Sequence, residues 1–150
     1  MARRPGPRRP AADALAAGLV AAALSGVPST AWTLARRESL LDGARAAGSL
    51  LVRDPRAGDP ALLAAAVPAH LGLSVGWAVV LARVVPRGRE VPGCALGGLA
   101  IAALDLGVIA PRWAPRVRAL PQGRQWADHV AFGLAVGVML RVRRTSTAAG

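Results

Sequence analysis

The feature that most constrains this chain is the separation of its charges from its apolar residues. Arginine clusters alternate with long uncharged runs of Ala, Leu, Val and Gly. Charge is costly in hydrocarbon and stable at its edges, so this block pattern is typical of a membrane protein. A soluble basic protein would distribute its charges through its helices. The composition agrees, because 53% of the residues are apolar although the net charge is +11.

Four mostly apolar runs predict membrane-spanning helices, which need about 20 mostly apolar residues to cross a hydrocarbon core of about 30 Å. They are residues 14–35, 61–82, 93–111 and the shorter run 126–140. Gly26 and Pro28 should kink or break the first helix. We therefore expect an all-α fold, a polytopic transmembrane helical bundle of four spans within residues 11–144. Residues 1–10 and 145–150 are expected to be disordered.

The first run has a second interpretation, as a signal peptide. The arginines of residues 3–9 would form its basic region, residues 14–24 its apolar region, and Ser29-Thr30-Ala31 its small-residue cleavage site. Cleavage would leave three spans. The uncharged run continues well beyond a short apolar region, and this favours a span.

A short amphipathic helix at residues 39–52 is predicted to lie at the membrane interface between the first two spans. Its apolar face would carry Leu40, Ala44, Ala47 and Leu51. Ser39 followed by Asp42 is a start similar to a capping box. Asp59 and Pro60 should then provide the N-cap and the first helical residue of the second span.

Polar side chains inside the runs form the candidate site. At 1.5 Å per residue, His70 lies about 15 Å below the start of its span, and Asp105 about 10 Å below the Arg112 edge. Asp128 and His129 lie about one turn in from Arg124. Because consecutive spans alternate in direction, these residues fall in the same half of the bilayer. Three tryptophans mark the same boundary, as an aromatic belt would: Trp32, Trp113 and Trp126.

We predict that His70, Asp105 and either Asp128 or His129 form one polar cluster, open toward the face that carries the amphipathic helix. Ser74 shares a helix face with His70. His70 is the expected donor to Asp105, and this pair would either lock the helix register or bind a ligand or a proton. Simpler roles exist for the last two residues. Asp128 could stabilise the first turn of its own helix, and the ring of His129 could reach water at the interface.

Glycines four residues apart let helix backbones approach closely in lipid. Such small-residue pairs recur along the chain: Gly18/Ala22, Ala22/Gly26, Gly72/Gly76, Gly93/Gly97 and Gly133/Gly137. We expect the second and third spans to pack closely through Gly72/Gly76 or Gly97/Gly98. The same faces could instead join copies of the chain in a homo-oligomer.

Several function classes are disfavoured. The arginines stand where juxtamembrane anchors stand and no recognition motif occurs, so a nucleic-acid partner is not expected. The sequence has no HExxH, GxSxG, P-loop or GxGxxG motif, so we expect neither an enzyme nor a cofactor. Two His residues and a few Asp residues form no recognisable metal site. The single Cys94 excludes an intrachain disulfide and is expected to be a small apolar residue near a helix start.

Five stretches carry a resemblance to known proteins: "SGVPST", "ARAAGSLL", "HLGLSVGWAVVLA", "AIAALDLGVIAPR" and "ADHVAFGLAVG". Together they resemble small, uncharacterised integral membrane proteins of high-GC Gram-positive bacteria. The resemblance covers most of residues 14–140. It implies four helices and neither an activity nor site residues.

The sequence therefore predicts a multi-pass protein of the plasma membrane, with the lipid bilayer as its partner and a structural or accessory role without catalysis. The alternative is a small, proton-coupled carrier that uses His70 and Asp105. A four-helix multidrug exporter would need a carboxylate within its first span, whereas Asp13 lies at the edge of that span. The N-terminal arginines favour cytoplasmic termini, although the two faces carry almost equal numbers of arginines.

Overall fold

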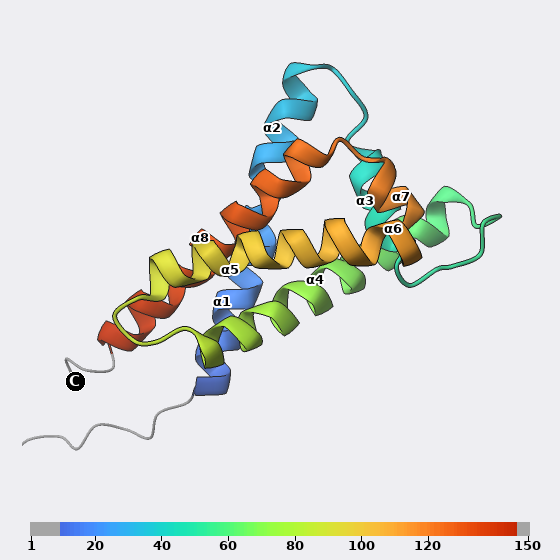
Figure 1. Ribbon diagram of the computed structural model, residues 1–150. Helices are drawn as coiled ribbons and strands as arrows, with labels where there is room; N and C mark the ends of the chain where they lie inside the picture. Colours follow the sequence, from blue (N-terminus) through green and yellow to red (C-terminus); the bar gives the residue numbers. More distant parts are fainter. Residues whose placement is uncertain (1–9, 147–150) are drawn as a thin grey trace, which may run out of the picture.

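The computed structural model describes residues 10–146, which form helices joined by turns and short loops (Figure 1). The described residues contain no strand, so the all-α class is confirmed for them. The elements are α1 Pro10–Ser25, α2 Val27–Ala35, α3 Leu41–Gly48, α4 Asp59–Val84, α5 Glu90–Leu104, the π-helix η1 Asp105–Ile109, α6 Ala110–Trp113, α7 Pro115–Ala119 and α8 Gln122–Ser146. The two predictions of disorder lie outside the described residues, apart from Pro10, which opens α1, and Thr145 and Ser146, which close α8.

Three stretches of helix are long and apolar enough to cross a membrane. They are Pro10–Ala35 (α1 and α2), Asp59–Val84 (α4) and Glu90–Trp113 (α5, η1 and α6). Their outer surfaces expose large apolar side chains such as Leu19, Val67 and Leu99, which lipid would cover. These three candidate spans suggest a multi-pass membrane protein. The fourth expected span, at residues 126–140, lies in α8, which is not among the three.

α8 is the helix around which the others are arranged. It packs most extensively against α5, then against α1 and α2, and touches α4. Its Val136 and Leu140 side chains are fully buried. Figure 1 shows α8 crossing α1 and α5 obliquely. The polar residues that lower the hydropathy of α8 thus belong to the helix with the most protein neighbours.

Glycines bring α5 and α8 into backbone contact. A Cβ atom added to Gly133 would collide with the Cys94 carbonyl oxygen, and one added to Gly137 would lie 2.6 Å from the Glu90 carbonyl oxygen. From the other side, a Cβ on Gly98 would collide with the His129 carbonyl oxygen. The predicted small-residue packing therefore occurs, between the third apolar helix and α8.

The predicted close packing of the second and third spans through Gly72/Gly76 is wrong. α4 and α5 are consecutive, yet they make few contacts, because α4 packs on α1 and α5 packs on α8. Among residues 10–146, nothing lies within 4 Å of a Cβ built on Gly72 or Gly76. The two helices meet near their connecting turn, where Leu81 packs against Gly97.

Two apolar helices are irregular at the same end of the molecule. Gly26 separates α1 from α2, and Pro28 has no N–H to continue the hydrogen-bond ladder, so the expected break is confirmed. In the third helix, η1 begins at Asp105 and Pro111 follows two residues after it ends. A proline removes a backbone donor from the helix, and π-turns accommodate such defects.

α3 and α7 lie at this same end (Figure 1). α3 is shorter than the predicted 39–52 helix and docks on α4, where a Cβ on Gly48 would collide with the Leu62 carbonyl oxygen. The expected cap of α4 is displaced by one residue. Gly58 is the N-cap, and the Asp59 carboxylate instead binds Arg45 on α3.

Candidate polar site inside the bundle

The predicted polar residues divide into three interactions, each between different helices. Asp105, the first residue of η1, has its Oδ2 atom 3.5 Å from Nε2 of His129 on α8. Both side chains are about one-quarter exposed, at 24% and 21%. The predicted partner of Asp105 was His70, and this is wrong. The helix that packs against α5 is α8, so the histidine of α8 faces Asp105.

The His129 ring is held at both nitrogens. Its Nδ1 atom lies 2.7 Å from the carbonyl oxygen of Gln125, one turn earlier in α8. Its Nε2 atom faces Asp105. The ring is therefore directed into the interface between α8 and η1, and His129 is not simply a surface residue with its tip in water.

Asp128 does not cap its own helix as expected. α8 begins at Gln122, so Asp128 lies in the second turn, where backbone amides are already bonded within the helix. Its Oδ1 atom accepts a 2.9 Å hydrogen bond from the backbone N–H of Ser29. Ser29 lies in the first turn of α2, whose amides lack intrahelical partners and whose dipole favours a nearby carboxylate. The break at Gly26 creates this helix start, and Asp128 caps it from another helix.

His70 joins α4 to α1. Its Nε2 atom lies 2.9 Å from the carbonyl oxygen of Ala22, in the last turn of α1, where carbonyls lack regular partners. Because a carbonyl only accepts, Nε2 is the donor. His70 is also close enough to Asp128 to interact with it electrostatically. Ser74 is buried one turn further along α4.

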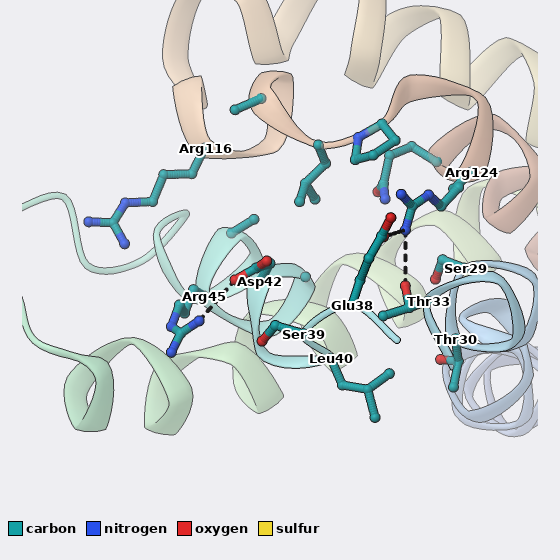
Figure 2. A pocket seen from close by; sticks show the side chains of 16 residues that line it. Ser29, Thr30, Thr33, Glu38, Ser39, Leu40, Asp42, Arg45, Arg116 and Arg124 are labelled. Atoms are coloured by element: carbon teal, nitrogen blue, oxygen red, sulfur yellow. Dashed lines mark hydrogen bonds and ion pairs between the residues drawn. The ribbon is translucent and has the colours of Figure 1, made fainter. Parts of the chain in front are cut away.

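A pocket of about 580 Å³ opens at the end of the molecule that carries α3 and α7 (Figure 2). Its walls come from α2, the segment before α3, α3 itself, α7 and the start of α8. We call it the interfacial pocket. Ser29 and Gln125 both line it, and these residues are the hydrogen-bond partners of Asp128 and His129. The pocket lies on the α3 face, toward which the polar cluster is expected to open, but its lining in the described part of the chain does not include His70, Asp105, Asp128 or His129 themselves.

Ion pairs hold the walls of the interfacial pocket in place. Figure 2 shows Arg124 between Glu38 and Thr33, at 2.6 Å and 3.1 Å. On the other side, Arg45 binds Asp42 at 2.9 Å and Asp59 at 2.6 Å. The hydrogen bonds that Arg45 donates to the Asp59 carboxylate raise the pKa of Arg45 further above its usual value, so Arg45 stays cationic throughout the accessible pH range.

Two ion pairs at the opposite end were not expected from the sequence. Arg143 binds Asp13 at 2.6 Å, and Arg144 binds Glu90 at 3.0 Å and the Ala82 carbonyl oxygen at 2.9 Å. They connect α8 to α1, α5 and α4. The sequence did contain a signal for these pairs. Asp13 and Glu90 stand at the edges of predicted spans, on the same side of the membrane as the C-terminal arginines.

No protein-family model, curated protein or solved structure matches this chain. The site must therefore be interpreted from its own geometry. Within residues 10–146, no three His, Cys, Asp or Glu side chains gather closely enough to hold a metal ion. What the site contains is an imidazole facing a carboxylate, a second carboxylate on a helix start, and a pocket beside both.

Proposed function

We propose that this chain is a four-span protein of the plasma membrane with a structural or accessory role and no catalytic activity. One observation carries the proposal: the polar side chains within the bundle each bind a group on a neighbouring helix. Asp128 binds α2, His70 binds α1 and His129 faces η1. Such contacts fix helix position and register, which a scaffold requires. The resemblance to small four-helix membrane proteins of high-GC Gram-positive bacteria fits the same proposal.

The fourth span in this proposal is α8. Its 25 residues extend about 37 Å, enough to cross a hydrocarbon core of about 30 Å. Arginines flank its apolar part, with Arg124 before it and Arg141 after it. Leu134 and Val138 are exposed and would face lipid. The polar groups of α8 are directed at other helices, and this explains how a helix of low mean hydropathy can cross.

An even number of spans places both ends of the chain on the same side, which we propose is the cytoplasm. Reporter fusions after Gly150 and after Arg87, in the turn between α4 and α5, test this arrangement. A reporter active only inside the cell is expected to work at both positions, and one after Arg56 should be silent. A Gly150 fusion that reports the outside of the cell would overturn the four-span topology.

A small proton-coupled carrier is the second candidate function. The observation that favours it is the interfacial pocket, whose lining residues Ser29 and Gln125 contact Asp128 and His129. A scaffold needs the side-chain contacts, but it does not need a pocket lined by the partners of these side chains. Purified protein in liposomes should then show solute flux that depends on a pH gradient, and Asp105→Asn should abolish it without unfolding the protein. Absence of any such flux supports the scaffold.

A further inference from the structure

The hydrogen-bond geometry of His129 indicates which of its ring nitrogens carries a hydrogen, and therefore how many protons the Asp105–His129 pair needs. The Gln125 carbonyl oxygen can only accept, so Nδ1 of His129, 2.7 Å away, must carry a hydrogen. In a neutral ring the other nitrogen, Nε2, then has a bare lone pair. That lone pair faces the Asp105 Oδ2 atom at 3.5 Å. With an ionised Asp105 and a neutral His129, two acceptors would oppose each other in a part of the protein that lipid surrounds.

One additional proton removes this conflict. It can reside on Nε2, giving an imidazolium beside a carboxylate, or on Oδ2, giving a carboxylic acid that donates to a neutral imidazole. Both arrangements form one hydrogen bond and leave the pair with no net charge. Without the proton the pair carries one negative charge, which is costly inside a bilayer.

We propose that Asp105 and His129 together bind one exchangeable proton, which reaches them from the interfacial pocket. This inference goes beyond the proposed function, because it applies equally to a scaffold and to a carrier. The proton comes from water in the pocket, bonds to the Nε2 lone pair or to the carboxylate, and returns to water on release. No bond between heavier atoms changes.

The surroundings of the pair support binding of a single proton from one side. The other titratable groups nearby are Asp128 on α8 and, close to Asp128, His70 on α4. The α1 helix has Asp13 at its far end, bound to Arg143, and α2 has no charged residue. Gln125, whose carbonyl oxygen contacts Nδ1 of His129, lines the pocket on the face that carries α3, and Ser29, the partner of Asp128, lines it too. At the opposite end, Glu90 is bound by Arg144.

Protonation at this position has a mechanical consequence. Asp105 is the first residue of η1, where the third helix leaves regular α geometry, and its partner lies on the central helix. The bound proton therefore joins an irregular segment to α8. Its loss replaces an attractive contact with a repulsive one at the first residue of η1.

Histidine-selective ¹⁵N NMR on the full chain in nanodiscs tests the proposal, since the chain has two histidines. His70→Gln assigns the remaining ring to His129. At pH 7 we expect either a protonated Nε2 signal from His129 or an infrared band of a protonated carboxyl, and either one should be lost in Asp105→Asn. The asparagine amide can still donate to the bare Nε2, so this variant keeps the contact. An identical titration of His129 in both proteins, or a wild type that shows neither signal, would overturn the shared proton.

Cysteine labelling tests the route separately, and the flux assay described above is independent of both measurements. The native Cys94 is buried and is first replaced by alanine. In sealed vesicles, a membrane-impermeant thiol reagent should label Ser29→Cys, or Gln125→Cys, from the α3 side alone. The matched control is Leu104→Cys, next to Asp105 in sequence and exposed on the outer surface. It should stay unlabelled because lipid covers it. If neither pocket position is labelled in folded protein, or if labelling occurs from both sides of the membrane, access from the pocket is contradicted.

Discussion

Replacing Gly133 by alanine is expected to separate α5 from α8. The added Cβ atom would collide with the Cys94 carbonyl oxygen and lie 3.2 Å from the Ala95 Cα atom. These neighbours are backbone atoms of a helix and cannot rotate away as a side chain could. One helix must therefore move, and with it the contacts that Val136 and Leu140 make in the core.

Two opposing effects set the magnitude. Overpacking a tight interior costs about 1–3 kcal/mol, and a collision with backbone should lie at the upper end. Alanine is a better helix former than glycine by about 1 kcal/mol, which offsets part of this cost. The net loss should be about 2 kcal/mol. For a chain of this size, a loss of that order lowers the midpoint of thermal unfolding by about 4–8 °C.

Gly76→Ala is the matched control. It makes the same chemical change in a long apolar helix, but no described residue lies within 4 Å of the added atom. Helix propensity alone should make this variant equal to or slightly more stable than the wild type. Thermal unfolding of both variants in the same detergent, followed by circular dichroism, measures the difference. If Gly133→Ala unfolds at the same temperature as Gly76→Ala, α5 and α8 do not approach as closely as the structure shows.

Two further substitutions test interactions that join helices. Asp128→Ala removes the cap from the start of α2, so the midpoint of thermal unfolding should fall by the equivalent of about 1 kcal/mol; an unchanged midpoint would mean that the Ser29 amide does not depend on Asp128. Arg144→Met leaves the carboxylate of Glu90, which is 5% exposed, without its arginine, and breaking such a buried pair costs about 3–5 kcal/mol. Adding Glu90→Gln to Arg144→Met should recover much of that loss, and a double variant no more stable than Arg144→Met would show that the unpaired charge is not the cause.

The sequence alone was sufficient to predict the all-α class and the position of most helices. Hydrocarbon excludes charge, so the uncharged runs located three candidate spans with little ambiguity. The break at Gly26 and Pro28 also followed from local chemistry, because proline cannot donate to the ladder. The common depth of Asp105, Asp128 and His129 followed from the rise per residue of a helix.

Only the tertiary structure decided which of these groups meet. Helices that are apolar on all sides carry no strong signal of which face is buried, so their rotation and their neighbours are not encoded in local periodicity. The glycine pairs indicated close contact between helices, but they did not indicate which helix would be the partner. Gly133 packs against α5, whereas in the described part of the chain nothing lies within 4 Å of a Cβ on Gly72 or Gly76. Once α8 had packed between α1 and α5, His129 rather than His70 faced Asp105, and Asp128 became the cap of a helix almost one hundred residues earlier in the chain. Helix positions depend on the transfer of single segments between water and lipid, but helix partners depend on contacts that exist only when all segments are assembled.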